Sequence, residues 1–150
     1  MVVAPKATAP FIRLCIDLTR VNSHLKYGHY PIPNVRHIIE ELQGFNCFID
    51  ADVKNGFHGY ILDEESRDRL TVTTPMGNFR PKFMPEGLAC ANLKFMEAMN
   101  FCFDDLNDGC ERKWCYVLHA NILLDGFSDD NLYEKMKIFL QRCKERNVYL

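Results

Sequence analysis

The stretch Tyr116-Val-Leu-His-Ala-Asn-Ile-Leu-Leu124 decides the fold of this chain. Two short apolar runs flank a tight turn in it, which is the layout of a β-hairpin. The turn positions Ala120 and Asn121 carry no negative charge, so they offer a cation at most one neutral carbonyl oxygen. The stretch therefore predicts two paired strands over residues 114–124, joined by a turn that contains no acid.

The segments around this hairpin alternate between helical and extended patterns without a regular order. Apolar residues recur at helical spacing over residues 34–42 and 88–103, and Ser128 is placed to cap a third helix. Strand patterns occupy residues 2–3 with 11–17, residues 48–53, and both sides of a turn at 75–77. We expect the strand at 48–53 to be buried. This mixture favours the α+β class, with an antiparallel sheet packed on helices.

Composition limits the kinds of protein that this chain can be. Its 150 residues, of which 47% are hydrophobic and 25% charged, are enough for one core, so a single domain over residues 1–150 is predicted. No apolar run approaches the roughly 18 residues that a membrane-spanning helix needs, so no span is predicted. The net charge of −2 argues against strong nucleic-acid binding, because such binding usually relies on a basic face.

The seven cysteines indicate a reducing compartment. Their number is odd, their spacing is irregular and most lie in apolar patterns, which suits buried thiols of an intracellular protein in the cytosol, nucleus or an organelle matrix. Cys110, Cys115 and His119 form a Cys-x4-Cys-x3-His arrangement that matches no standard zinc spacing, with Cys102 as a further candidate ligand. We interpret these cysteines as buried thiols and predict no metal; metal binding is the alternative.

Further segments accompany the hairpin in a fixed order along the chain. They are residues 1–6 with 12–17, Tyr30-Pro-Ile-Pro33, Asp52-Val-Lys-Asn-Gly-Phe-His58, residues 62–67, Thr73-Thr-Pro-Met-Gly77 and Met84-Pro-Glu-Gly-Leu88. Together with the hairpin they resemble the reverse transcriptase domain of gypsy-type LTR retrotransposons over residues 1–150. The resemblance implies a palm with partial fingers, with about 1–45 fingers-like and 46–150 palm-like, and with the thumb absent.

The resemblance also identifies the catalytic positions. In that family three aspartates, two of them on the hairpin turn of the YxDD motif, hold two magnesium ions about 4 Å apart. Asp52 takes the place of the first aspartate, whereas Ala120 and Asn121 stand where the hairpin aspartates would be, so that the charge of the three positions falls from −3 to −1. Loss of such groups commonly costs several orders of magnitude in rate. The resemblance therefore predicts a pseudoenzyme without a cofactor, in which Mg²⁺ is expected only if the chain is an active enzyme.

Asp50 is a further acid near this site. On a strand it shares a face with Asp52 and is displaced from it by about 6.6 Å. It belongs to the same strand as Asp52, so it cannot replace ligands on the opposing hairpin. A single cation held by Asp50 and Asp52 is one alternative, and a solvated or hydrogen-bonded strand residue is the other.

Other matching positions face the nucleotide in the family. Arg13 takes the place of a fingers arginine that contacts the triphosphate, and Lys6 lies near the place of its basic partner. Phe57 takes the place of the aromatic residue that screens the sugar 2′ face, with a core aromatic as the alternative. Gly87 is retained, although Glu86 replaces the usual aromatic before it. We interpret these positions as vestiges of a nucleotide site.

These observations favour a catalytically inactive, retroelement-derived domain that acts as a structural or interaction subunit of a larger protein assembly. Its expected partners are other protein subunits. The first alternative is an RNA-directed DNA polymerase fragment of a decayed retrotransposon. The second is a residual binder of nucleic acid that performs no chemistry.

Overall fold

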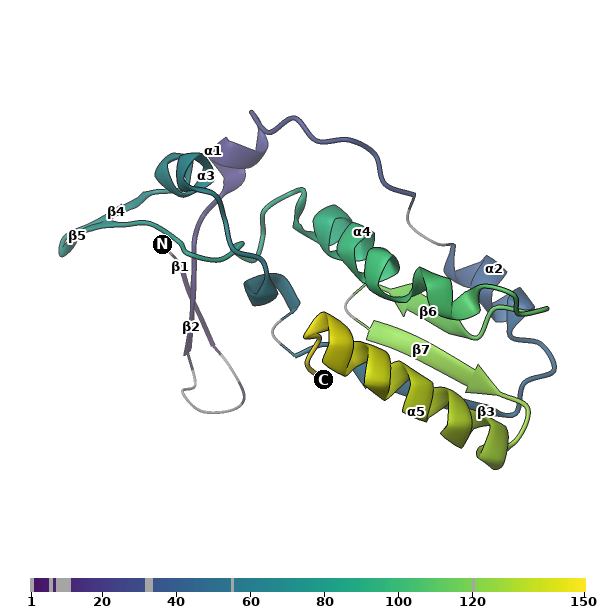
Figure 1. Cartoon of the computed structure of the whole chain (residues 1–150). Coiled ribbons are helices and arrows are strands. Elements are labelled where there is room, and N and C mark those ends of the chain that lie inside the picture. The colour runs from purple at the N-terminus through teal and green to yellow at the C-terminus, as the bar shows by residue number, and fades with distance from the viewer. Residues whose placement is uncertain (1, 6, 8–11, 32–33, 55, 120) are drawn as a thin grey trace. The chain divides into compact units, whose positions relative to one another are not determined.

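The computed structural model describes residues 2–5, 7, 12–31, 34–54, 56–119 and 121–150 (Figure 1). The chain divides into two compact units, each assembled from two segments. The first unit contains Met1–Gly28 with Asn55–Ala91, and the second contains His29–Lys54 with Asn92–Leu150. None of these boundaries falls at residue 45, where the sequence suggested a division into fingers-like and palm-like parts. The prediction of a single domain stays a prediction.

The first unit carries two small antiparallel sheets. β1 (Val2–Pro5) pairs with β2 (Ile12–Cys15), and β4 (Val72–Thr74) pairs with β5 (Gly77–Phe79). Gly77 has a φ of 123°, which glycine adopts easily because it has no Cβ. Both predicted strand pairings are confirmed.

Helices α1 (Thr19–Asn22) and α3 (Glu64–Arg69) and the 3₁₀ helix η1 (Gly56–Gly59) complete the first unit. The Asp63 side chain caps α3 by accepting a hydrogen bond from the backbone N–H of Ser66 at 2.8 Å. The first turn of α3 is acidic and its last turn is basic, which suits the helix dipole. The core of this unit groups Leu18, Leu70, Met84, Leu88 and Ala91.

The second unit is built on a three-stranded antiparallel sheet in the order β3-β7-β6. β6 (Cys115–Leu118) and β7 (Asn121–Gly126) form the hairpin that the sequence predicts, and β3 (Cys47–Asp52) pairs with the other side of β7. The prediction that β3 is buried is wrong. Its residues alternate between half-buried and exposed, and Phe48 is 48% exposed, because β3 is an edge strand that turns only one face to the core.

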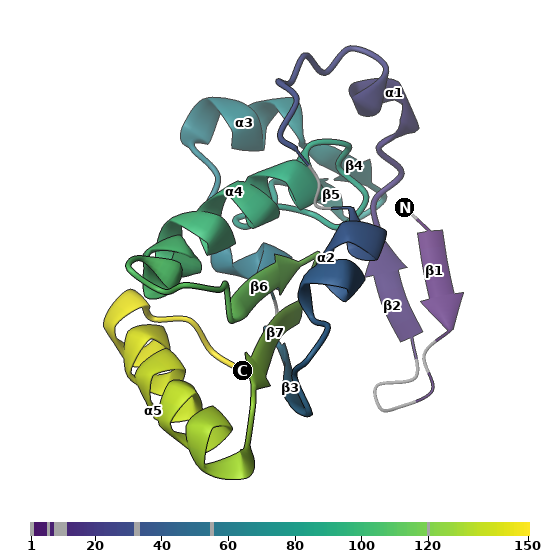
Figure 2. The ribbon, with the colours of Figure 1, turned by 90° about the vertical axis from the view of Figure 1, so that its right-hand side faces the viewer.

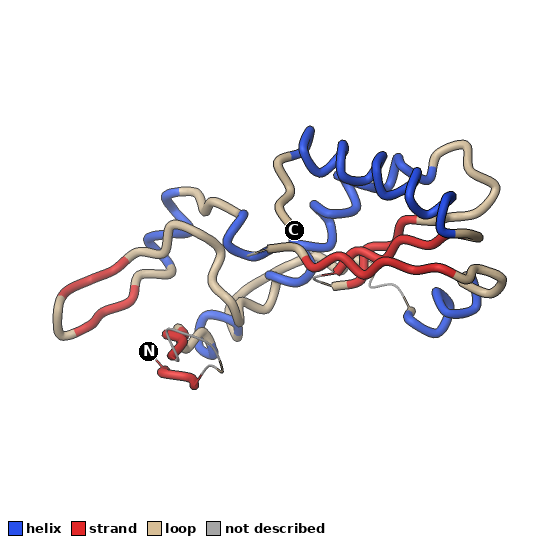
Figure 3. Tube along the Cα trace, turned by 90° about the horizontal axis from the view of Figure 1, so that it is seen from below, coloured by secondary structure: helices blue, strands red, loops and turns tan. Residues whose placement is uncertain are grey.

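Helices α2 (Val35–Glu41), α4 (Ala91–Phe103) and α5 (Asp129–Arg146) and the 3₁₀ helix η2 (Asp104–Asn107) surround this sheet. α5 packs on one face of the sheet and α2 lies on the opposite face (Figures 2 and 3). The rings of Phe103 on α4 and Phe139 on α5 are both 1% exposed, and their centroids are 5.2 Å apart. Ser128 caps α5 as predicted. Within the described chain, no helix has the length and apolar character needed to cross a bilayer.

Gly126, the last residue of β7, lies against the first turn of α5. A Cβ built at Gly126 would be 2.8 Å from the Cβ and 3.0 Å from the backbone of Leu132. Since backbone atoms cannot yield cheaply, we expect Gly126→Ala to lower the free energy of unfolding by about 1–3 kcal/mol. Urea denaturation measures this loss. Gly28→Ala is the control, because among the described residues no atom beyond its chain neighbours lies within 4 Å of the added Cβ. Equal losses in the two variants would refute the steric argument.

Candidate functional site at the hairpin

The hairpin brings two of the three predicted catalytic positions together. Asp52, the last residue of β3, is the register partner of Asn121, the first residue of β7. On its other side Asn121 pairs with Leu118 of β6. His119 in the turn has a left-handed φ of 52°, and Ala120 lies outside the described residues. Asp52 and Asn121 therefore lie opposite each other at one end of the sheet.

The side chain of Asn121 is engaged with Asp50. Its amide Nδ2 donates hydrogen bonds to both carboxylate oxygens of Asp50, at 2.8 Å to Oδ1 and 2.9 Å to Oδ2. Asp50 is the register partner of Leu123, so Asn121 reaches it diagonally across the strand pair. Asp50 is thus a hydrogen-bonded strand residue, and the alternative of a single cation held by Asp50 and Asp52 stays a prediction.

The donor set at this end of the sheet does not fit a two-magnesium site. Magnesium requires anionic oxygens in near-octahedral arrangement and dehydrates reluctantly. Asp50 and Asp52 both come from β3, and the facing position on β7 is an amide whose N–H groups are directed at Asp50. Among the described residues, no three His, Cys, Asp or Glu side chains gather closely enough to hold a metal ion. Asn121 and Asp50 instead link β7 to β3 by hydrogen bonds.

The predicted nucleotide-binding positions all belong to the first unit. Lys6 lies outside the described residues, and the structure describes the backbone but not the side chains of Arg13 and Phe57. Arg13 pairs with Ala4 in the β1–β2 sheet. Gly87 has a left-handed φ of 88°, and its carbonyl oxygen accepts a hydrogen bond from the Asn22 amide at 2.9 Å. Roles for these residues in nucleotide binding stay predictions.

The interpretation of the cysteines as buried thiols holds for two of the seven, whereas four are half-buried and one is exposed. Cys115 is buried, and burial raises the pKa of its thiol to about 12. Burial likewise raises the pKa of Cys143 to about 11. Cys110 is exposed, contrary to its interpretation as a buried thiol, because it follows the η2 segment at the surface. Without a bound metal these buried thiols are therefore protonated near neutral pH.

Sequence reasoning missed a buried ion pair next to the sheet. Asp125 on β7 is fully buried, and the Lys135 ammonium on α5 donates to its Oδ1 at 3.3 Å and to its backbone oxygen at 2.9 Å. The second carboxylate oxygen of Asp125 has no hydrogen-bond partner among the described residues. The only signal in the sequence is an acid within an apolar run, which alone does not identify its partner.

The free energy of unfolding should depend on pH through the buried carboxyl of Asp125. Burial raises the pKa of Asp125, although Lys135 acts in the opposite direction. A carboxyl with a raised pKa binds protons more strongly in the folded chain, so its contribution to stability falls as the pH rises through that pKa. We expect the unfolding free energy of the native chain, relative to that of Asp125→Asn, to increase as the pH is lowered towards the ordinary carboxyl pKa of about 4.

The matched control for this titration is Asp63→Asn. Hydrogen bonds from Ser66 lower the pKa of Asp63, so its contribution is present above the unfolded pKa and is lost as the pH falls. The two variants should therefore show opposite trends relative to the native chain. Urea denaturation across this pH range measures both, and parallel trends would show that Asp125 does not titrate as a buried acid.

Comparison with known proteins places these features in context. No protein-family model matches the chain. It is 27% identical over 155 residues to the retrovirus-related Pol polyprotein from transposon 412 of Drosophila melanogaster. The aligned region covers 100% of this chain and 12% of that polyprotein. It is 26% identical over 138 residues to the enzymatic polyprotein of cauliflower mosaic virus, and this aligned region covers 92% of this chain and 20% of that polyprotein. The chain thus spans a fifth or less of these polyproteins.

The fold has a close counterpart among solved structures. The crystal structure of a mutant prototype foamy virus protease-reverse transcriptase matches 98% of this chain and 19% of that chain, with a TM-score of 0.82 and 14% sequence identity. The chain therefore has a reverse-transcriptase-like α+β fold, with an antiparallel sheet packed on helices, as the sequence predicts.

Proposed function

We propose that this chain is a retroelement-derived, reverse-transcriptase-like domain that has lost polymerase activity and serves as a structural or interaction subunit of a larger protein assembly. The observation that carries the proposal is the pair of hydrogen bonds from Asn121 to Asp50. They place an engaged, neutral amide where nucleotidyl transfer requires a free carboxylate. The polyprotein relatives and the fold support an origin in a retroelement.

The loss of activity follows from electrostatics. Two divalent ions close together repel each other, and only anionic ligands on both sides of the pair can hold them. Of the three positions that the resemblance assigns to this task, Asp52 alone is charged. Removal of charged members of such a set typically costs several orders of magnitude in rate. The proposed domain therefore needs no cofactor.

Exposed apolar side chains support a protein partner. On α2, Val35 and Ile39 lie one helical turn apart and are 52% and 60% exposed, and on α4 Phe101 is 74% exposed. Grouped apolar residues on a surface commonly mark interaction sites. We therefore propose that partner subunits cover part of the second unit. The seven free thiols support a reducing, intracellular location for this assembly.

Affinity purification of the tagged chain from its native source tests the interaction role. The chain should be recovered with other proteins in fixed stoichiometry, and Val35→Lys with Ile39→Lys should weaken that recovery if α2 is part of the interface. Recovery as a free monomer alone would contradict the proposal. Template-dependent primer extension with Mg²⁺ or Mn²⁺ would instead support the polymerase alternative. Salt-sensitive retention of a primer–template on filters would support the nucleic-acid binder.

A further inference from the structure

We propose that a pocket at the far end of the second unit binds small aromatic carboxylates, independently of the proposed loss of catalysis. Its apolar walls are Phe45, Trp114, Phe127 and Ile138, and its cations are Arg112 and Lys135. We call this the aromatic pocket. It has a volume of about 490 Å³, within the roughly 300–1,000 Å³ typical of ligand sites. Phe127 follows β7 at the end opposite Asn121, about 20 Å along the strand from the hairpin turn.

The aromatic walls provide flat apolar surface for a ring. The rings of Phe45 and Phe127 stack with centroids 4.4 Å apart and an interplanar angle of 29°. Phe45 and Trp114 are buried, whereas Phe127 is 52% exposed and so presents part of its ring to solvent. A phenyl-sized ligand fits this surface because offset stacking with aromatic side chains is favourable.

Lys135 forms the charged floor of the aromatic pocket. Its Nζ lies 5.3 Å from the ring centroid of Phe45, 5.5 Å from that of Trp114 and 5.8 Å from that of Phe127. An ammonium has three N–H donors, and Lys135 directs hydrogen bonds to two atoms of Asp125. Asp125 therefore offsets much of its charge, and Lys135 acts mainly by holding the three rings in place.

Arg112 supplies the cation that recognises the ligand. Its guanidinium carbon lies 4.5 Å from the Phe45 ring centroid, and its Nη2 donates to the backbone oxygens of Glu41 and Gln43. These bonds go to neutral carbonyls, and within the described part of the chain no carboxylate forms an ion pair with Arg112. Because these two bonds use both hydrogens of Nη2, a carboxylate would accept from the Nε–H or Nη1–H groups of this guanidinium.

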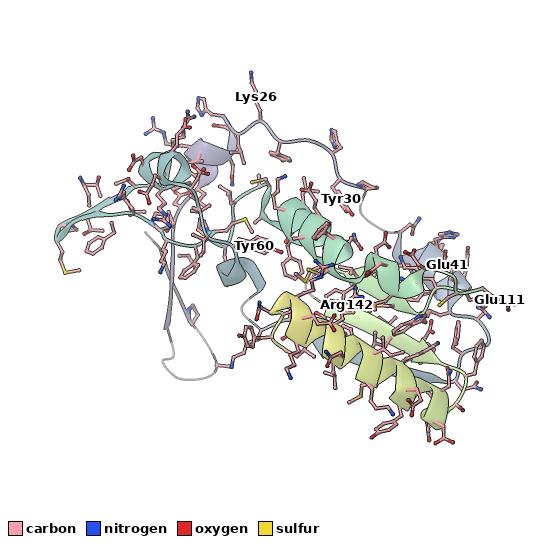
Figure 4. All side chains as sticks on the ribbon, in the orientation of Figure 1. Lys26, Tyr30, Glu41, Tyr60, Glu111 and Arg142 are labelled. Carbon is pink, nitrogen blue, oxygen red and sulfur yellow. The ribbon has the colours of Figure 1, made fainter. Side chains whose placement is uncertain are left out.

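Two acidic residues lie near the aromatic pocket, so the proposal depends on whether the pocket prefers a negatively or a positively charged ligand. Glu111 lines the aromatic pocket, and Glu41 and Glu111 lie at the same end of the second unit (Figure 4). If these acids dominated, the pocket would prefer an aromatic amine. Arg112 and Glu111 are both exposed, but the Arg112 guanidinium is fixed against the Phe45 ring by its bonds to the backbone oxygens of Glu41 and Gln43. We infer a preference for the carboxylate from this fixed cation.

Phenylacetate and phenethylamine test this inference, because they carry opposite charges on the same ring. Titrations use the full chain, with calorimetry and the emission of Trp114, the only tryptophan of the chain. Phenylacetate should bind saturably and change the Trp114 emission, whereas phenethylamine should bind more weakly. Arg112→Gln should weaken phenylacetate binding about tenfold or more. Lys113→Gln removes a neighbouring cation outside the pocket and should leave binding unchanged.

The proposal would be overturned by the absence of saturable phenylacetate binding, by equal or tighter binding of phenethylamine, or by equal losses in Arg112→Gln and Lys113→Gln. Arg112 also contacts the chain after α2, so the folding of its variant is checked by urea denaturation. Phe127→Ala provides a second variant at a half-exposed wall residue. It should weaken phenylacetate binding in a folded chain, and unchanged binding would exclude this pocket as the site.

Discussion

Replacing Asn121 by aspartate is expected to create a divalent-cation site that the native chain does not have. The new carboxylate would face Asp52 across the strand pair and lie next to Asp50, so acids would come from both β3 and β7. One added charge about 4 Å from a divalent ion contributes roughly 2 kcal/mol in a water-like dielectric, or roughly 30-fold in affinity. Electron paramagnetic resonance of free Mn²⁺ measures this gain.

The same substitution should destabilise the chain when metal is absent. Asn121 now donates to both oxygens of Asp50, whereas an aspartate at this position would repel them. We expect Asn121→Asp to lower the unfolding free energy by about 1–3 kcal/mol, and Mn²⁺ to restore part of this loss by binding the folded state. Asn78→Asp, the same chemical change at an exposed position of β5, is the control. If it gained Mn²⁺ affinity equally, the hairpin geometry would not be the cause.

Phe139→Ala is expected to lower the free energy of unfolding by about 3–5 kcal/mol. Phe139 is 1% exposed and packs on Phe103, so it links α5 to α4 in the core of the second unit. Its loss would leave a cavity that the surrounding rings cannot fill, and a loss of this size is a large part of the roughly 5–15 kcal/mol that stabilises a typical protein. Urea denaturation followed by far-ultraviolet circular dichroism measures the change.

Leu140→Ala is the matched control for this core substitution. Leu140 follows Phe139 on the same helix but is 41% exposed, so its truncation removes less buried area. Alanine has a helix propensity at least as high as that of either residue, so helix formation does not explain a difference. We expect a loss of less than about 1.5 kcal/mol. Similar losses at both positions would mean that α5 does not turn Phe139 into the core.

Local signals explain why the hairpin and α5 could be predicted from the sequence. The two apolar runs and the polar turn at residues 116–124 lie next to one another in the chain. Ser128 and the acids after it mark the start of α5, and Lys144 and Arg146 mark its end. The prediction missed α3 because its residues Glu64–Arg69 contain no apolar face. That helix is supported by the Asp63 cap and by ion pairs between its own side chains.

The contacts of the site depend on register and packing, which the sequence does not reveal. The resemblance predicted Asp52 and Asn121, but the bond between Asn121 and Asp50 joins residues 71 positions apart and exists only in the observed register of β3 and β7. A shift of one residue would turn Asp50 to the other face of the sheet. In the same way, the contact between Asp125 and Lys135 arises only when α5 packs on β7. The residue types identified the candidate site residues, but only the three-dimensional arrangement determines which side chains they contact.

Anomalous scattering from crystals of the native chain soaked in Mn²⁺ tests the central claim most directly, because it locates bound ions without requiring activity. We predict no ordered Mn²⁺ between Asp52 and Asn121. Two manganese ions about 4 Å apart, coordinated by Asp52 and the hairpin turn, would contradict the claim that this site has lost its metal chemistry.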